Sequence, residues 1–200
     1  LIDKKAELKH PELESQCDFI FRVDVKNFAA IEAAMASIKD DVMVVTCRAV
    51  FYMPAYANMI VLFPHLILPT RDSLEYCSNK LSMRRKYRRY SPEINPSFTV
   101  VHGATKKDVE KVMTKVGFPC IVKPASLAAS RLISICFHKE ELQKTLRKTF
   151  YAIRAVYKKN NALREPEVIV EQFMEGEQYA IDGYVDVRGE EITLLPPTHY

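Results

Sequence analysis

Lys123 and Glu171 are the two charged residues of this sequence whose neighbours most need a chemical explanation. Lys123 follows three apolar residues and precedes Pro124, a pattern that predicts a buried strand with an ammonium group at its end. Removing that charge from water is costly, and either a nucleotide phosphate or an internal carboxylate would compensate the cost. Taken alone, the pattern favours the simpler interpretation, in which a strand-end lysine keeps its charged head in water.

Glu171 raises the same question with the opposite charge. Alternation along residues 167–173 puts it on one strand face with Ile169 and Phe173, among apolar neighbours. A carboxylate in that place needs hydrogen-bond donors, so we expect either a lysine partner or the amine of a ligand. The alternative is an edge strand that leaves Glu171 open to water, and the strand by itself favours that alternative.

Three segments resemble, in order and with similar gaps, the motifs of the ATP-grasp family. Residues 78–84 are similar to the helix start dK..mr, residues 117–124 to the strand gfP.ivKP, and residues 170–183 to the hinge vEefm.G.eysvdg. Each match alone is weak, whereas three in the family order are a more specific signal. The resemblance extends over residues 77–200.

This resemblance implies a nucleotide site. Lys80 and Lys123 take the places of the two lysines that contact phosphate in the family, one from each side. Lysine suits phosphate as a mobile point charge, and a strand edge beside apolar side chains suits a flat base. The family hinge binds adenine through its glutamate, here Glu171, and through the main chain of the residues that follow, here Gln172, Phe173 and Met174.

The resemblance also implies a reaction, in which ATP converts a carboxylate into an acyl phosphate that an amine or similar nucleophile attacks. The expected cofactors are ATP and Mg²⁺, and the expected partners are ATP, an unidentified small-molecule acid and a nucleophile. In the family, the carboxylates and the asparagine that hold Mg²⁺ follow the hinge hairpin, and residues 196–200 contain no such set. We therefore assign neither a metal ligand nor a catalytic residue.

Two further departures from the family pattern concern the phosphates and the ribose. The loop after the second lysine contains no glycine, so its backbone is less free to fold over phosphates, although Ser126, Ser130 and Arg131 remain candidate phosphate contacts. Gln178 stands where the family commonly has a ribose-binding glutamate, with Glu177 beside it. Ribose contact is therefore expected from Gln178, as a neutral hydrogen bond, or from Glu177.

These departures leave two interpretations open. In the first, the chain is an incomplete catalytic unit of an ATP-grasp ligase, inactive by itself, and is either a fragment of a longer protein or a natural truncated relative. In the second, it is a non-catalytic nucleotide-binding or interaction module that kept the fold and lost the chemistry. The loop without glycine favours the second interpretation.

A basic run at residues 84–90 gives a third interpretation. It contains five cations and two tyrosines, which could contact the phosphates and bases of a nucleic acid. Helical spacing favours instead a solvated helix with Met83, Tyr87 and Tyr90 turned inward. We therefore do not expect nucleic acid as a partner.

The elements that must position these residues fall into two groups. Residues 1–76 predict alternating strands and helices: strand 18–25, helix 28–38, strand 42–47, helix 51–63 and strand 66–68. Such alternation predicts an α/β layer with a parallel sheet. The resemblance makes this region a partial pre-ATP-grasp α/β domain.

Residues 77–200 predict an incomplete ATP-grasp domain of the α+β class, with a helical linker (77–97), an ATP-binding subdomain (98–175) and the start of a second subdomain (176–200). Asp72 or Ser73 can cap a helix that runs through Tyr90, and Thr105 can cap one that Gly117 ends. A long amphipathic helix is expected at 139–158. Short connections predict antiparallel pairing among strands at 98–101, 119–123, 132–137, 167–173, 178–187 and 191–195.

Composition adds little about function. The net charge of +4 draws anions without distinguishing nucleic acid from a nucleotide. Five cysteines without metal-ligand spacing, and the lack of a visible secretory signal, favour a reducing, cytoplasmic setting. The longest apolar stretch, at 50–69, is interrupted by prolines, so no membrane association is expected. A homo-oligomer is left open.

Overall fold

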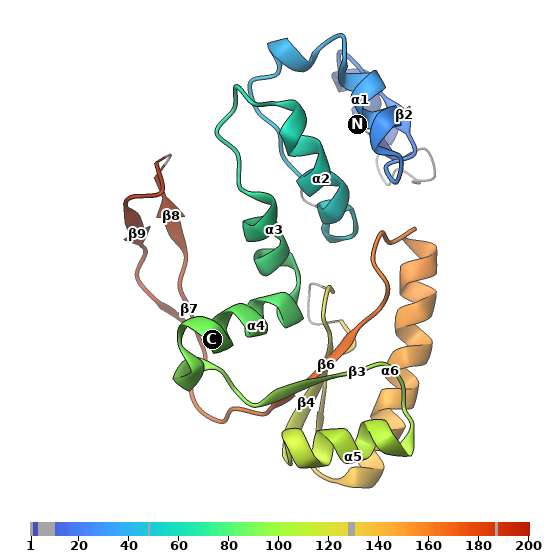
Figure 1. The fold of residues 1–200 in the computed structure, drawn as a ribbon, viewed down its shortest axis with the longest axis vertical. Helices are drawn as coiled ribbons and strands as arrows, with labels where there is room; N and C mark the ends of the chain where they lie inside the picture. The colour runs from blue at the N-terminus through green and yellow to red at the C-terminus, as the bar shows by residue number, and fades with distance from the viewer. Residues whose placement is uncertain (1, 4–10, 48, 128–130, 187) are drawn as a thin grey trace.

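The computed structural model describes residues 2–3, 11–47, 49–127, 131–186 and 188–200 (Figure 1). The first part of the chain is mainly helical. It contains the strands β1 (Ile2–Asp3) and β2 (Arg22–Val23), the helix α1 (Phe28–Met35), the short 3-10 helices Pro11–Gln16 and Lys39–Asp41, and the helix α2 (Met53–Met59) between the 3-10 turns Val50–Tyr52 and Ile60–Leu62.

The parallel sheet expected for this part is mostly absent from the described residues. β1 and β2 do pair in parallel, but over two residues each. Residues 42–47 and 66–68 were expected to be strands and are not, so these two predictions were wrong. Met43 and Val44 are exposed there, and no strand of the described part of the chain pairs with this segment.

A helix was predicted to run unbroken to Tyr90, and the structure divides it in two. α3 (Arg71–Ser78) ends and α4 (Lys80–Tyr90) begins at Asn79, whose extended backbone belongs to neither helix. The cap of α3 is Thr70 and not Asp72 or Ser73, because Thr70 accepts a hydrogen bond from the amide of Ser73. The proposed division between residues 76 and 77 lies inside α3 and stays a prediction.

The centre of the fold is a four-stranded antiparallel sheet in the order β3, β6, β4, β5. Its strands are β3 (Phe98–Val101), β4 (Cys120–Pro124), β5 (Ser134–Cys136) and β6 (Val168–Gln172). β6 pairs with β3 on one side and with β4 on the other, so it is a central strand. The mixed helical and antiparallel architecture confirms the expected fold class.

Two helices cover one face of this sheet. α5 (Lys106–Lys115) is capped by Thr105 in a reciprocal capping box with Asp108, and Gly117 follows it with the expected positive φ. α6 (Lys139–Lys159) is the long amphipathic helix. Both helices contribute to the main core, which includes Val101, Val109, Val112, Val122, Leu142, Leu146, Ile153, Val168 and Val170.

The opposite face of the sheet carries a smaller cluster together with the start of α4. Leu81 of α4 packs there with Phe98, Ala125 and Ile169. Figure 1 shows α3 and α4 on this side, between the sheet and the N-terminal helices. Residues of β4 and β6 that point away from the main core therefore face α4.

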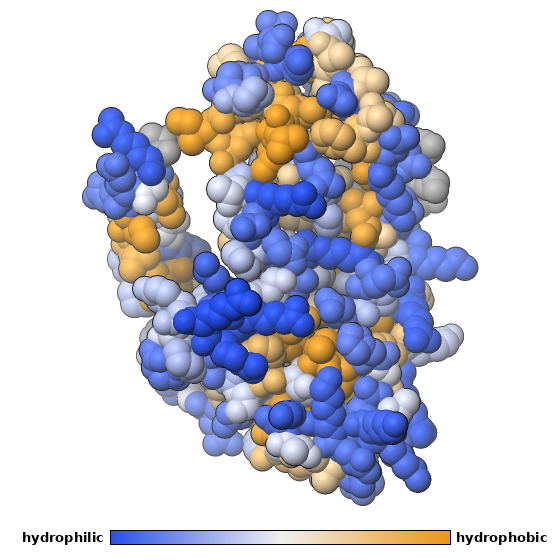
Figure 2. All heavy atoms as spheres, in the orientation of Figure 1, coloured by the Kyte–Doolittle hydropathy of each residue, from blue (hydrophilic) through white to orange (hydrophobic). Residues whose placement is uncertain are grey.

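The last part of the chain forms two thin ribbons. β7 (Tyr179–Ala180) pairs with β10 (Thr198–His199), and β8 (Gly183–Val185) pairs with β9 (Ile192–Leu194). The β8–β9 ribbon exposes large apolar side chains and stands apart from α3 in Figure 2, which also shows hydrophobic surface over the N-terminal helices. Among the described residues, no helix is both long enough and apolar enough to cross a membrane.

Candidate functional site

A buried ion cluster lies between the sheet and α4. Glu171 of β6 pairs in register with Ile121 of β4, and Lys123 lies two residues further on the same face. The Nζ atom of Lys123 is 2.6 Å from Oε2 of Glu171, and the two side chains are 15% and 2% exposed. Both simpler expectations were wrong: Lys123 does not keep its head in water, and Glu171 is not on an edge strand.

Arg84 completes the pair from the opposite side. Its Nε donates to Oε1 of Glu171 and its second terminal nitrogen to Oε2, both at 3.0 Å, and the arginine side chain is 11% exposed. Two parallel bonds of this kind fix a carboxylate in orientation as well as in charge. Glu171 therefore has an arginine and a lysine as partners at the same time.

These partners keep the carboxylate ionised. Burial alone would raise the pKa of Glu171, but the hydrogen bonds from Arg84 and Lys123, together with their charges, outweigh burial and hold that pKa below its ordinary value. A buried carboxylate with a single weak donor would instead have a raised pKa, because burial would then outweigh the hydrogen bond. The carboxylate of Glu171 is therefore ionised at neutral pH.

Lys80, the first residue of α4, lies next to this cluster. Its Nζ donates to the carbonyl oxygen of Leu127 at 2.6 Å. Burial first, and then repulsion by Lys123, lower the pKa of Lys80, while attraction by Glu171 opposes them. Three cations thus face one carboxylate, which leaves an excess of two positive charges in a partly buried site.

The backbone at the start of α4 offers no anion cradle of its own. The amide of Lys80 donates to the carbonyl of Ala125, and the amides of Leu81 and Ser82 both donate to Oδ1 of Asn79. The next amide donates to the carbonyl of Asn79, so each of the first four amides has an acceptor. An anion at this place would be held by side-chain ammonium groups.

The hinge that follows Glu171 is partly engaged. The amide of Gln172 donates to the carbonyl of Ser97, and the amide of Phe173 donates to the carbonyl of Pro119. Phe173 is half-buried, whereas Met174 is 61% exposed. A main-chain donor for a base would therefore have to come from Met174.

The loop after β4 begins inside the protein. Ser126, one of the expected phosphate contacts, is buried and bonded to Arg164, so the structure does not bring it to the ion cluster. Arg131 is exposed. Ser130 lies outside the described residues.

The two candidate ribose contacts lie further along the chain. Glu177 pairs with His199, and the carbonyl of Gln178 accepts the amide of Tyr200. Within the described part of the chain, neither side chain forms a hydrogen bond or ion pair with the cluster. These contacts hold the β7–β10 ribbon together.

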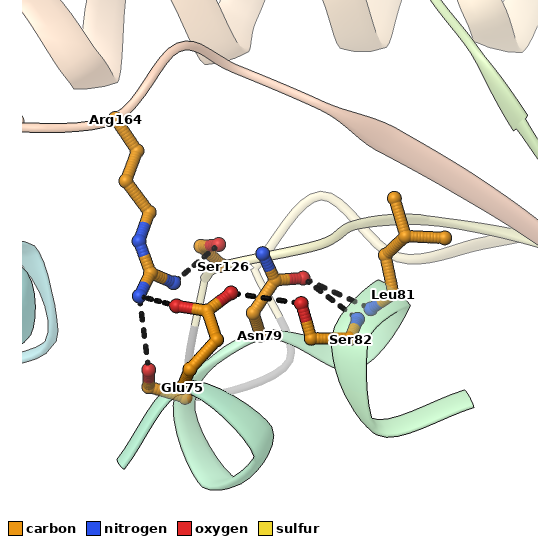
Figure 3. A network of polar contacts seen from close by, with 7 residues as sticks. Glu75, Asn79, Leu81, Ser82, Ser126 and Arg164 are labelled. Carbon is orange, nitrogen blue, oxygen red and sulfur yellow. Dashed lines mark hydrogen bonds and ion pairs between the residues drawn. The ribbon is translucent and has the colours of Figure 1, made fainter. Parts of the chain in front are cut away.

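A second polar network lies beside the first (Figure 3). Arg164, from the loop between α6 and β6, pairs with Glu75 of α3 and donates to Ser78 and Ser126, both at 3.4 Å. Glu75 in turn accepts a hydrogen bond from Ser82 of α4 at 2.8 Å. The network therefore joins three segments that are far apart in the sequence.

Two cavities among the described residues lie away from the ion cluster. One of about 550 Å³ is lined by Arg147, Tyr151 and Arg154 of α6, and one of about 380 Å³ lies between α2, α3 and Arg164. Neither is lined by the two candidate lysines. The ion cluster is the better candidate for a functional site than either cavity. Burying charges is costly, so a buried charge is retained only for structure or function, whereas a surface hollow carries no such cost.

The basic run at residues 84–90 forms the expected helix, but its side chains are placed differently from the expected inward and outward faces. Arg84 is buried in the cluster, and the guanidinium of Arg88 lies 4.1 Å from the centre of the Phe98 ring. Tyr87 and Tyr90 are exposed and not turned inward, so that expectation was wrong.

Arg84 and Arg164 were missed as site residues in the sequence. A signal existed for Arg84, because it lies three residues after Leu81 and a helix face that buries one tends to bury the other. For Arg164 the sequence holds no comparable signal, since its partners are 38 to 89 residues away.

Comparison with known proteins identifies a known domain in part of the chain. Residues 116–196 match the ATP-grasp domain. An uncharacterised protein of Sinorhizobium fredii is 27% identical over 183 residues, which cover 90% of this chain and 35% of that protein.

Solved structures agree with the fold. The L-amino acid ligase from Bacillus licheniformis superposes with a TM-score of 0.63 at 19% identity, over 87% of this chain and 39% of the ligase. Carboxyaminoimidazole ribonucleotide synthase from Aspergillus clavatus, solved with ATP, gives 0.62 at 16% identity, over 97% of this chain and 46% of the synthase. This chain thus spans less than half the length of these relatives. The domain match assigns residues 116–196 to the ATP-grasp domain, and these solved ligase and synthase structures share the fold of the chain.

Proposed function

We propose that this chain binds ATP as the nucleotide-binding part of an ATP-dependent ligase that joins a carboxylate to an amine or a similar nucleophile. The observation that carries the proposal is the ion cluster, in which Lys80, Lys123 and Glu171 converge from three distant segments. An excess of two positive charges in a partly buried place is suited to phosphate.

Arg84 explains how Lys123 could serve a nucleotide. Suppose that Lys123 were the only partner of Glu171. Its movement toward a phosphate would then leave a buried carboxylate without a counter-ion, at a large cost in free energy. Arg84 holds both oxygens of Glu171, so the carboxylate keeps a counter-ion while the flexible lysine moves. Lys80 would exchange its bond to a carbonyl oxygen for one to phosphate.

The base would lie along the hinge. The amide of Met174 and a carbonyl of the hinge would provide the donor and acceptor, with Phe173 as an apolar wall. Since Glu171 already accepts three hydrogen bonds, we assign it to positioning the cations more than to base recognition. Glu177 and Gln178 would approach the ribose, and Arg131 the phosphates.

ATP would supply the phosphoryl group that activates the acid, and the residues above would bind and orient it. Within the described residues, no three His, Cys, Asp or Glu side chains are grouped so as to hold a metal ion. We therefore assign no Mg²⁺ ligand among these residues. The acid and the nucleophile would be small molecules.

Equilibrium binding of a non-hydrolysable ATP analogue tests the proposal. We expect saturable binding that weakens about tenfold or more in Lys80→Ala and in Lys123→Met, because each removes a cation that faces phosphate. Lys107→Ala is the matched control, since Lys107 is exposed on α5, and should leave the affinity unchanged. Absence of saturable binding at millimolar nucleotide would remove ATP from the function.

A non-catalytic module of the same fold is the second candidate. It is favoured by the engagement of Lys80 with Leu127 and of Ser126 with Arg164, which anchors the start of the loop after β4 in the protein. ATP turnover by the longest available form of the protein, with candidate acids and amines present, separates the two candidates. Binding without turnover supports the module, and phosphate release that depends on an acid supports the ligase.

A further inference from the structure

We propose that Arg164 is a positioning residue for the nucleotide site, which fixes the place of the Lys80 ammonium group without contacting the nucleotide. The predicted effect of Arg164 on ATP affinity rests on the function proposed above. Its predicted effect on the position of the Lys80 ammonium group does not. The guanidinium group lies at the junction of α3, α4 and the loop after β4 (Figure 3).

On one side, Arg164 holds the junction of the two helices. It pairs with Glu75, and the other oxygen of Glu75 accepts from Ser82, in the first turn of α4. Asn79 caps the same turn by accepting from two amides. The direction in which α4 leaves α3, and with it the position of Lys80, is thus fixed by the cap of Asn79 and by Arg164 and Ser82, which both bond the Glu75 carboxylate.

On the other side, Arg164 holds the loop. Ser126 stands between Ala125 and Leu127, and the carbonyls of these two neighbours accept from the amide and from the Nζ of Lys80. Arg164 and Lys80 therefore grip the same three-residue segment. All three of its residues are buried.

This grip accounts for a loop that has no glycine. A glycine-rich loop can approach phosphate with its backbone, whereas here a cluster of side chains fixes where the loop starts. The planar fork of arginine is suited to this task, because it donates to Glu75 and Ser126 from different nitrogens. A lysine provides the charge but cannot make both contacts from fixed positions.

The reactivity of Lys80 gives a test that does not depend on ATP. The native protein and its variants are treated with limiting acetic anhydride at mildly alkaline pH, and the acetylation rate of Lys80 is measured by peptide mass spectrometry relative to Lys107. In Arg164→Met we expect the relative rate of Lys80 to rise about fivefold, because its bond to Leu127 is held less firmly. In Arg164→Lys the relative rate of Lys80 should lie between those of the native protein and Arg164→Met. Arg154 is an exposed arginine of α6, so Arg154→Met should give the native rate.

Ser126→Ala removes the contact of Arg164 with the loop, together with a hydrogen bond between Ser126 and Tyr157, and it is the variant to test if Arg164→Met does not fold. It should raise the relative rate of Lys80 about twofold. An unchanged Lys80 rate in the folded Arg164→Met variant, or in Ser126→Ala if the first does not fold, would overturn the proposal, even where thermal stability falls.

Nucleotide affinity is the second readout. If the native protein binds the ATP analogue, Arg164→Met should weaken binding about fivefold, in step with the Lys80 rate. An unchanged affinity would show that Arg164 does not position the lysine for phosphate. If the native protein binds no nucleotide, the proposed function fails, and the acetylation rates still decide whether Arg164 positions Lys80.

Discussion

Replacing Glu171 with glutamine removes the only negative charge from the ion cluster while keeping its shape. Arg84 and Lys123 would then remain at 11% and 15% exposure without a counter-ion. Removing one partner of a buried ion pair typically costs about 3–5 kcal/mol. Because the glutamine oxygen can still accept from Arg84, we expect a loss near the lower end, about 3 kcal/mol.

The assay is urea unfolding at neutral pH, followed by far-ultraviolet circular dichroism because the chain contains no tryptophan. Glu175→Gln is the matched control, since Glu175 is an exposed acid four residues away, and its effect should stay within about 0.5 kcal/mol. A loss of less than about 1 kcal/mol in Glu171→Gln would refute the view that the cluster depends on this carboxylate.

The pH dependence of stability provides an independent check on the same residue. The pKa of Glu171 in the folded protein lies below the ordinary value of 4.5, so its stabilising effect is complete above that value and is lost as the pH falls through the folded pKa. The native protein should therefore lose stability more steeply than Glu171→Gln on acidification below about 4.5. Parallel curves for the two proteins would contradict the assignment.

The remaining predictions concern the cap, the lysine and the cysteine pair. Asn79→Ala should lower the free energy of unfolding by about 1 kcal/mol in urea, because two amides of α4 lose their acceptor. Burial, followed by repulsion from a neighbouring lysine, lowers the pKa of Lys80, so calorimetry across alkaline pH should show ATP-analogue affinity falling earlier than in Lys80→Arg, which stays charged. A hydrogen bond from Cys120 lowers the pKa of the buried Cys136 to about 7, so Cys120→Ala should move the thiolate absorbance transition to higher pH.

The sequence was most informative where local rules and spacing act together. The cap at Thr105, the stop at Gly117 and the long helix before residue 160 follow from hydrogen-bond chemistry within a few residues, and the structure has them where expected. The convergence of Lys80, Lys123 and Glu171 was expected from ordered motifs, and a lysine partner for Glu171 was one of two alternatives. The paired bonds from Arg84 were not expected.

The sequence was least informative where an outcome depends on distant partners. Residues 42–47 form an apolar run that has the composition of a strand, so a strand was predicted there. Whether a neighbouring strand pairs with the run cannot be read from the run itself. The break at Asn79 has a similar origin, because the start of α4 is fixed by the bonds of Lys80 to the distant loop after β4. The fork of Arg164 joins residues that no local pattern connects.

The position of β6 in the middle of the sheet has a consequence for how the protein is made. β3 and β4 both pair with β6 and not with each other, yet β6 is the last of the four strands to leave the ribosome. The sheet cannot close until that strand arrives, so folding depends on long-range contacts made late in synthesis. The same strand delivers the carboxylate that neutralises Arg84 and Lys123, so the charged centre and the sheet are completed in one event.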